Sequence, residues 1–401
     1  NIRPRDIVTK KSLENAAVIV AASGGSTNAA LHLPAIANEA GIKFTLEDVS
    51  NLNTKLPMPK TPKPIILIGA GGIVTDAHLP AYKKSGYVVS GIFDPIKEKA
   101  EKCAKDYLIP NIYSSEEDCF NQKDVVFDIA VPPQVLLEVL KKIPKNSICQ
   151  LQKPMGNSMA EAAEIKKIIK EKNIIACVNL QLKFSPMMIA LKNAIDKGMI
   201  GKITELEISL SVGTPWHLWP FLEKLDNVEV PLHSIHYLDW IRSIIGDPKS
   251  VHCKSIKHPN LTKLSDSRSS IILDYGNDLR CCLSLNHTHD NKSHGMKHSH
   301  AYARVEGLTG AAYIKFGLLL NYPKGEPEAI EISTYGVSWT KVNNVGTWFP
   351  DAFIGTMSSL QRYAAGEDNH LPHSVDNAYK TMAVVYACLE SSSKPGTKVN
   401  Y

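Results

Sequence analysis

The sequence predicts an α/β protein with a parallel sheet in its first large domain and a mostly antiparallel, open sheet in its second. Strand-like and helix-like segments alternate over residues 64–180, which is typical of a doubly wound parallel sheet. Over residues 181–401, one helix precedes several strand-like runs with alternating apolar residues, which indicates a sheet with one buried face. Four prolines within LPMPKTPKP separate these domains from a short helical leader.

The leader comprises residues 1–53, and the proline-rich linker comprises residues 54–63. KKSLENAAVIVAA and AALHLPAIANEAG have the apolar spacing of helices, and Thr45 can cap a third short helix in FTLEDVSNL. In the last domain, PMMIALKNAIDKG predicts a helix, and SLQRYAAGE and NAYKTMAVVYACLESS predict two closing helices. The expected strands there are KITELEISLSV, SVHCKSIK, SSIILDYG, LRCCLSLN and AYIKFGLL.

The stretch from Pro64 to Asp94 predicts a strand, a glycine turn, a helix and a second strand. The apolar run over residues 65–68 is followed at once by Gly69-Ala70-Gly71, where bare backbone N–H groups can approach a phosphate. Asp94 ends the second strand, where a carboxylate can accept both hydroxyls of an adenosine ribose. These features together predict a Rossmann domain that binds a dinucleotide, with a glycine turn in an ordinary βαβ unit as the alternative.

The residues expected to contact this cofactor lie in the glycine turn and at the strand ends. They are Gly69, Ala70, Gly71, Gly72, Ile73, Val74, Asp94, Pro132, Pro133, Gln152 and Lys153. Val74 replaces the third glycine of the pattern and should hold the helix slightly away from the strand. We expect NAD rather than NADP because Asp94 would repel a 2′-phosphate, although Lys97 is a nearby cation that could accommodate NADP.

Lys153 and His236 are the candidate catalytic residues. Lys153 follows a buried strand and is fixed by Pro154, so its ammonium can enter the cofactor crevice; a surface lysine is the alternative. His236 lies on a predicted helix in HSIHYLDWIRSIIGDP, and an imidazole can take the proton of a hydroxyl as hydride leaves the carbon. A structural histidine is the alternative there.

Two further stretches rich in histidine and tryptophan are candidate substrate contacts. Trp216 and His217 in TPWHLWPFL can form a wall against which a sugar ring packs, or they can be loop packing. His287 is the first histidine of NHTHDNKSHGMKHSH, whose HxH pairs lack a well-spaced carboxylate or cysteine partner. We therefore predict a polar loop at a strand end in preference to a zinc site, and no metal.

Composition excludes several functional classes. The net charge of +5 comes from 45 basic and 40 acidic residues without a basic block, which argues against nucleic acid and anionic membranes as partners. No apolar run approaches ~18 residues, and NIRPRDIVTKKSLEN lacks the apolar core of a secretory signal. The eight cysteines form no CxxC pair, which fits reduced thiols in a cytoplasmic protein.

RPRDIVTKKSLENAAVIVAASGGSTNAALHLPAIANEAGI closely resembles an internal segment of the dihydroxy-acid and sugar-acid dehydratases. Those enzymes hold an iron–sulfur cluster through cysteine thiolates, whereas residues 1–60 contain no cysteine. We interpret the leader as a fusion remnant or a gene-boundary artefact; the alternative is a helical appendage with a packing role.

Residues 62–401 resemble the Gfo/Idh/MocA oxidoreductases, the family of glucose–fructose oxidoreductase and inositol dehydrogenase. GAGGIVTDAHLPAY is similar to the family's GxGxxA…HLPA opening, GIFDP and AVPP to two strand ends, QKPMG to its EKP motif, and HSIHYLDWIRSIIGDP to its histidine helix. The resemblance implies a nicotinamide cofactor, a sugar, polyol or sugar-acid substrate, and catalysis by Lys153 and His236. It also implies a homo-dimer or homo-tetramer assembled through the second sheet.

Four positions depart from the family motifs. Gln152 replaces the acid of EKP, Lys183 the arginine of RF, Leu136 a histidine, and Leu232 the acid four positions before His236. His233 stands beside that missing acid and competes with His236 as the base. The candidate substrate contacts are Lys183, Trp216, His217, His233 and His287.

The leading hypothesis is a cytoplasmic NAD(P)-dependent oxidoreductase that acts on a secondary alcohol or hemiacetal of a sugar, polyol or sugar acid. One alternative is a glycosidase or lyase that uses tightly held NAD for transient oxidation. A second alternative is a non-catalytic regulator that senses a nucleotide on the same fold. Net release of NADH supports the first hypothesis, turnover without net cofactor change the second, and cofactor binding without turnover the third.

Overall fold

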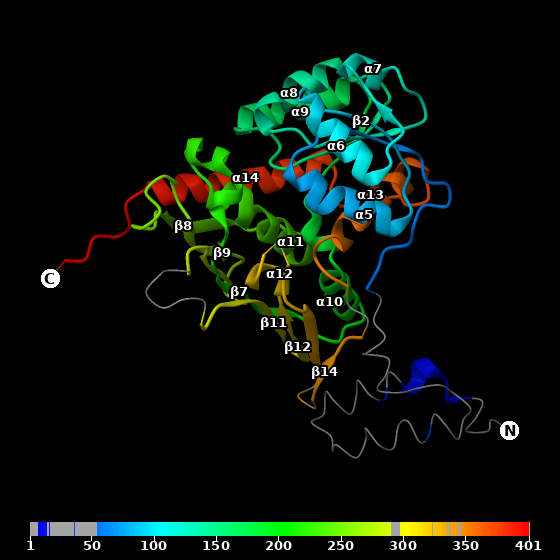
Figure 1. Cartoon of the computed structure of the whole chain (residues 1–401). Coiled ribbons are helices and arrows are strands. Elements are labelled where there is room, and N and C mark those ends of the chain that lie inside the picture. Colours follow the sequence, from blue (N-terminus) through cyan, green and yellow to red (C-terminus); the bar gives the residue numbers. More distant parts are fainter. Residues whose placement is uncertain are drawn as a thin grey trace.

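A computed structural model describes residues 7–13, 16, 36, 54–289, 297–322, 324–334, 336, 338–343 and 346–400 of the chain. These residues build two sheets with helices between and around them (Figure 1). The first sheet has six strands in the order β3-β2-β1-β4-β5-β6, and its strand pairs run parallel. This is the doubly wound order that the sequence predicts.

The elements of the first sheet and its connections are β1 (Ile65–Ile68), η1 (Val74–His78), α5 (Leu79–Ser85), β2 (Val89–Phe93), α6 (Lys97–Tyr107), β3 (Asn111–Ile112), α7 (Glu116–Phe120), β4 (Val126–Ile129), α8 (Pro133–Lys142), β5 (Ile148–Leu151), α9 (Met159–Glu171) and β6 (Ile175–Val178). β1 is buried along its whole length and pairs with β2 on one side and β4 on the other. Strand order reverses between β1 and β4, and ligands of open α/β sheets bind at the carboxyl ends of the strands at such a point.

The remaining elements are η2 (Gln181–Phe184), α10 (Pro186–Asp196), β7 (Ile203–Ser211), η3 (Trp216–Leu218), η4 (Pro220–Lys224), η5 (Val230–Ser234), α11 (Ile235–Ile245), β8 (Ser250–Ile256), β9 (Arg268–Asp274), β10 (Arg280–Asn286), β11 (His300–Gly307), β12 (Gly310–Lys315), α12 (Gly317–Leu320), β13 (Ala329–Thr334), β14 (Trp339–Lys341), α13 (Asp351–Ala364) and α14 (Val375–Ser393). The second sheet has the order β14-β13-β12-β11-β7-β10-β9-β8. Only the β7–β10 pair is parallel, so the predicted mostly antiparallel sheet is confirmed. Among the described helices, none is both long enough and apolar enough to cross a bilayer.

Three strands of the second sheet were not predicted from the sequence. β11 is central and pairs with both β7 and β12, yet its inward residues are mostly small, including Ala301 and Ala303. Alanine has little preference for strands, so the alternation there was weak. β13 and β14 were also missed, and AYIKFGLL is not one strand: it divides into the end of β12 and the short helix α12.

The two closing helices return to the first domain. α13 packs against α5, β5 and β6, and α14 packs against α9 and β6 as well as against β8. The N–H of Val178 donates to the carbonyl of His373 at 2.9 Å, which continues the edge of the parallel sheet. The C-terminal segment therefore contributes to both sides of the boundary predicted at residue 181.

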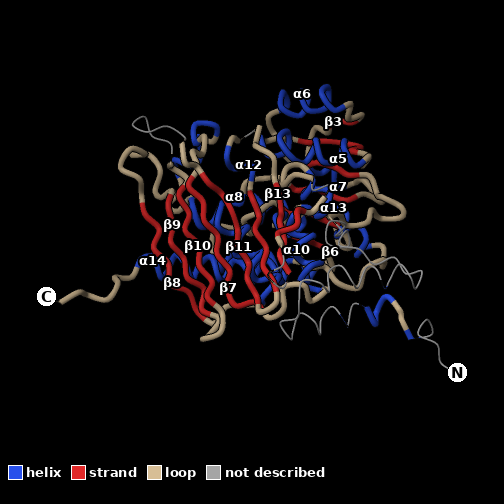
Figure 2. The backbone as a smooth tube through the Cα atoms, turned by 90° about the horizontal axis from the view of Figure 1, so that it is seen from below, coloured by secondary structure: helices blue, strands red, loops and turns tan. Residues whose placement is uncertain are grey.

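One face of the second sheet carries no described helix, as Figure 2 shows from below. Its outward side chains include charged pairs and aromatic groups. Arg280 pairs with Glu205, and the rings of Tyr302 and Tyr313 stack with their centroids 5.3 Å apart. The opposite face is apolar, with alternating buried residues such as Leu206, and it packs towards the helices.

Residues 54–63 lie against α13 and do not form a free linker. The N–H of Lys63 donates to Gln361 Oε1 at 2.7 Å, and the N–H of Lys60 donates to Glu367 Oε1 at 2.8 Å. Ser358 Oγ donates to the sulfur of Met58 at 3.3 Å. In the leader, residues 10–13 are helical as expected, whereas Thr45 and FTLEDVSNL lie outside the described residues.

These contacts predict that two truncations will differ. Removal of residues 1–53 should leave the melting temperature within about 2 °C and turnover within a few-fold, because the contacts with α13 remain. Removal of residues 1–63 should lower the melting temperature by roughly 5 °C or more, because it leaves buried Gln361 without a partner next to β1. Thermal melts of both truncated chains test this. Equal melting temperatures, or a tenfold loss of activity on removing residues 1–53 alone, would contradict it.

Candidate active site

The glycine turn follows β1 and is hydrogen-bonded to the end of β2. The N–H of Gly69 donates to the carbonyl of Phe93 at 2.7 Å. The carboxylate of Asp94 accepts from the N–H of Ala70 at 2.7 Å and from the N–H of Ile96 at 2.8 Å. Asp94 is therefore fixed at the tip of β2 and stays partly exposed, so its remaining lone pairs can accept hydroxyl groups.

The space beside Gly71 and Gly72 is open. A Cβ added to either residue would meet no atom within 4 Å, and the helix that continues into η1 begins at residue 72. The first N–H groups of a helix have no partner within that helix and favour anions. Val74 is fully buried, and after the end of β4 Pro132 precedes α8, which begins at Pro133. An open cradle with free backbone donors and a carboxylate at its edge fits the phosphates and ribose of NAD.

A buried polar network that the sequence did not predict begins at His78, the last residue of η1. His78 Nδ1 lies 2.6 Å from Asp128 Oδ2, which also accepts from the hydroxyl of Tyr82 at 2.6 Å. Amide nitrogens of Gln152 and Asn179 lie 3.2 and 3.3 Å from His78 Nε2. Because these amides donate, the ring proton of His78 belongs on Nδ1. The sequence could have indicated this network through Asp128, a charged residue within an otherwise apolar strand.

Gln152 connects this network to Lys153. Its Oε1 accepts from the N–H of Lys153 at 2.8 Å while its amide contacts His78, so the side chain is held at both ends. Lys153 Nζ donates to the carbonyl of Leu232 at 2.8 Å. Burial lowers the pKa of Lys153 from 10.5 to about 8. Lys153 thus leaves the end of β5 and reaches a turn of the second domain.

That turn, η5, and helix α11 bring His233 and His236 close to Lys153. Burial and the charge of Lys153 hold the pKa of His236 well below its usual value. Burial, then His287, Lys153 and His236 lower the pKa of His233. His236 Nδ1 is buried and has no hydrogen-bond partner among the described residues. Both imidazoles are therefore neutral near pH 7, and one of them has a nitrogen that could bind a ligand.

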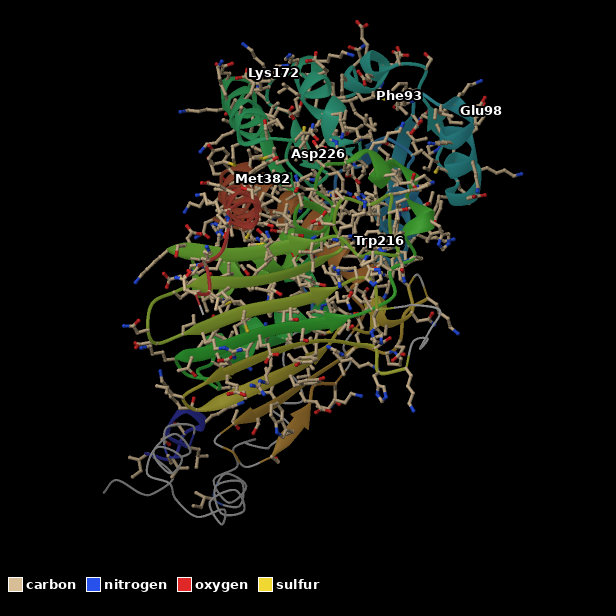
Figure 3. The ribbon with its side chains drawn as sticks, turned by 90° about the vertical axis from the view of Figure 1, so that its left-hand side faces the viewer. Phe93, Glu98, Lys172, Trp216, Asp226 and Met382 are labelled. Atoms are coloured by element: carbon tan, nitrogen blue, oxygen red, sulfur yellow. The ribbon has the colours of Figure 1, made fainter. Side chains whose placement is uncertain are left out.

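His287 and Trp216 complete the cluster. The rings of His287 and His233 lie 4.4 Å apart, and Trp216 meets both rings edge-on. The indole of Trp216 donates to the carbonyl of His287 at 3.2 Å. In Figure 3, Trp216 lies between the second sheet and the nucleotide-binding domain, whereas Lys172 lies at the far end of that domain. The buried acid Glu229, which the sequence did not indicate as a site residue, lies beside His287.

Two candidate substrate residues lie apart from the cluster. Lys183 Nζ pairs with Asp239 at 2.8 Å and donates to the carbonyl of Pro372 at 3.0 Å, with both side chains of the pair almost fully buried. His217 lies on the exposed side of η3. Within the described residues there is no group of three or more histidine, cysteine or acidic side chains that could hold a metal; His294 lies outside them.

Comparison with known families divides the chain into three parts. Residues 1–66 match the N-terminal domain of dihydroxy-acid/6-phosphogluconate dehydratases. Residues 63–180 match an oxidoreductase family with an NAD-binding Rossmann fold, and residues 188–312 match the Gfo/Idh/MocA C-terminal domain. A dihydroxy-acid dehydratase of Pelagibacter ubique is 75% identical over 64 residues, which are 16% of this chain and 11% of that enzyme. The chain thus spans about a tenth of the length of such dehydratases.

Solved structures share the fold of the remainder. An oxidoreductase from Agrobacterium radiobacter, in complex with NAD+, L-tartaric acid and magnesium, superposes with a TM-score of 0.68 at 18% identity, covering 83% of this chain and 97% of that one. An aldose-aldose oxidoreductase from Caulobacter crescentus, complexed with glycerol, gives a TM-score of 0.67 at 14% identity, covering 83% and 98%. The predicted pairing of a Rossmann domain with a mostly antiparallel α/β domain is confirmed.

Proposed function

Because the chain belongs, over residues 63–312, to the Gfo/Idh/MocA oxidoreductase family, we propose that it is an NAD-dependent enzyme that acts on a secondary alcohol or hemiacetal. The substrate class we propose is a sugar, polyol or sugar acid. The observation that supports this most strongly is the meeting of Lys153 with His233 and His236 beside the strand ends of the Rossmann sheet.

When bound, NAD accepts or returns a hydride at its nicotinamide ring. Gly71, Gly72 and Asp94 would hold its phosphates and ribose. As the substrate C–H bond gives up its hydride, the hydroxyl oxygen must lose a proton so that the carbonyl can form. We propose that Lys153 accepts this proton, because burial lowers its pKa to about 8. His236, which burial keeps neutral, would hold the same oxygen by a hydrogen bond. The sequence alone had favoured His236 as the base.

A screen of sugars, polyols and sugar acids with both nicotinamide cofactors tests the proposal. We expect net NADH formation with at least one compound of these classes. Product formation without net NADH would instead support the glycosidase or lyase alternative, and cofactor binding without any turnover would support a regulator. The leader contributes no cysteine ligand, so we propose no iron–sulfur chemistry for this chain.

NAD is expected to bind more tightly than NADP, by roughly tenfold or more. The Asp94 carboxylate is fixed by two backbone donors and would face the 2′-phosphate of NADP. Lys97, the nearby cation, pairs with Glu101 at 3.1 Å on the exposed surface of α6. Titration of both cofactors against the parent chain and Asp94→Ala measures the preference. Equal affinities in the parent, or an unchanged ratio in the variant, would contradict the assignment.

We also propose that the outer face of the second sheet joins copies of the chain into a dimer or tetramer in the cytoplasm. Its aromatic pair Tyr302 and Tyr313 and its intermixed charges are features of an interface. Seven of the eight cysteines are buried free thiols, which suits a reducing compartment. Light scattering of the purified protein gives the oligomeric state directly.

A further inference from the structure

A buried carboxyl, Glu229, lies behind the histidines of the candidate site. Glu229 is fully buried and directly precedes η5, whose last residue is Ser234. The hydroxyl of Ser234 lies 2.8 and 3.0 Å from the two carboxyl oxygens of Glu229. The two ends of η5 are therefore tied to each other through one carboxyl group.

His287 links Glu229 to the rings of the site. Its Nε2 lies 3.7 Å from Glu229 Oε1, and no described residue offers this nitrogen a hydrogen bond. Its Nδ1 lies 2.9 Å from Thr214 Oγ1, and its ring lies 4.4 Å from the ring of His233. An unpaired buried nitrogen is unfavourable, so a small approach of Glu229 to His287 would be favoured.

The same turn meets Lys153 on its other side. Leu232, in the middle of η5, accepts from Lys153 Nζ through its carbonyl, and His233 follows it. The turn therefore contacts Lys153 at Leu232 and Glu229 at Ser234. Leu232 is also the position at which the family motif has an acid, and the nearest acid before it in this chain is Glu229.

We propose that Glu229 is a positioning residue that holds the Leu232–His233 turn against Lys153 through Ser234 and His287, and that its ionisation sets the pH dependence of the site. The inference rests on the proposed function. It assigns this chain an acid that lies outside its sequence motifs.

The groups around Glu229 determine the pH at which its carboxyl group ionises. Burial raises its pKa from 4.5 to about 7; hydrogen bonds from Ser269 and Ser234 oppose this, and the charge of Asp266 adds to it. The other titratable groups that act on Glu229 or are influenced by it are His287, Tyr237 and Cys388. Below pH 7 the carboxyl group is protonated and can donate to His287. Above pH 7 it is a carboxylate, which can no longer donate to His287.

Glu229→Gln is the informative variant because it keeps the size and acceptor oxygen of the side chain but cannot ionise. Glu328→Gln is the matched control: Glu328 is buried, burial raises its pKa to about 7, and it accepts from the backbone N–H of Trp348 and Leu318 rather than contacting a histidine. Histidine ring NMR of the cofactor-free protein, from about pH 5 to about pH 9, gives the first readout. The pH profile of kcat/KM gives the second.

We expect the ring signals of His233 and His287 to shift with a midpoint near pH 7 in the parent and in Glu328→Gln, and to lose this step in Glu229→Gln. In Glu229→Gln the limb of the kcat/KM profile near pH 7 should disappear together with this step. Glu229→Asp should restore part of that limb. Identical titrations in the parent and Glu229→Gln would overturn the inference. Histidine ring signals that do not shift near pH 7 in the parent would also overturn the inference, and this result does not require the variant to fold. Absence of turnover with every substrate would instead count against the proposed function. The NMR result does not depend on turnover, so the two failures can be distinguished.

Discussion

Lys153→Met is expected to lower turnover on the order of 10²–10⁴-fold, the usual effect of removing a positioned acid–base group, while NAD affinity stays near that of the parent. Methionine retains most of the buried volume of lysine but can neither exchange a proton nor donate to the carbonyl of Leu232. Because burial lowers the pKa of Lys153 to about 8, the parent should also show a limb near pH 8 in its profile of kcat/KM, and the variant should lack it.

Lys172→Met is a matched control for this experiment. Lys172 also donates only to backbone carbonyls, those of Leu140, Lys141 and Ile143, and burial also lowers its pKa. It lies at the end of the Rossmann domain away from the crevice (Figure 3). We expect Lys172→Met to lose thermal stability but to keep its turnover, so the pair separates loss of a lysine that donates to backbone carbonyls from loss of catalysis.

Separate variants of the two histidines assign their roles. His236→Ala should lower turnover within the same range, because it removes the neutral ring proposed to hold the substrate oxygen. His233→Ala should have a smaller effect, since His233 packs on His287 and Trp216. If His236→Ala keeps near-normal turnover and His233→Ala abolishes it, the two assignments must be exchanged. If Lys153→Met and both histidine variants remain active, the catalytic site lies elsewhere.

The sequence predicted the nucleotide-binding half well because its signals are local. The four buried residues of β1, the glycine turn and Asp94 at the end of β2 all follow from neighbouring residues and from the chirality of βαβ units. Lys153 could be selected for the same reason, since a lysine just beyond a buried strand must emerge at the crevice.

The rest of the site depends on contacts between residues far apart in the chain, which periodicity does not encode. Glu229 and His287 are 58 positions apart by number (287 − 229), and only the fold brings them to 3.7 Å. Lys183 looked like a substrate contact by its motif, but Asp239 faces it from α11 and neutralises it. The small inward residues of β11 left a central strand without a clear pattern, although β7 and β12 on either side stabilise it.

Gly69→Ala should lower the free energy of unfolding by roughly 2–4 kcal/mol, the largest effect on stability that we expect from adding one methyl group. Gly69 has a φ of +107°, which L side chains rarely adopt, and a Cβ there would lie 2.4 Å from the carbonyl oxygen of Ala130 at the end of β4. Relief of that contact would require β1 and β4 to separate at the point where strand order reverses. Chemical denaturation measures the loss, and NAD binding should weaken with it because the turn itself is displaced.

Gly71→Ala distinguishes a glycine needed by the fold from one needed by the cofactor. A Cβ at Gly71 would meet no atom within 4 Å, so the unfolding free energy should stay within about 0.5 kcal/mol of the parent. The same methyl group would stand where the pyrophosphate of NAD approaches the backbone, so the dissociation constant for NAD should rise about tenfold or more. If Gly71→Ala binds NAD as the parent does, the dinucleotide does not lie in this cradle. If Gly69→Ala is as stable as the parent, the close approach of β1 to β4 is not what requires glycine there.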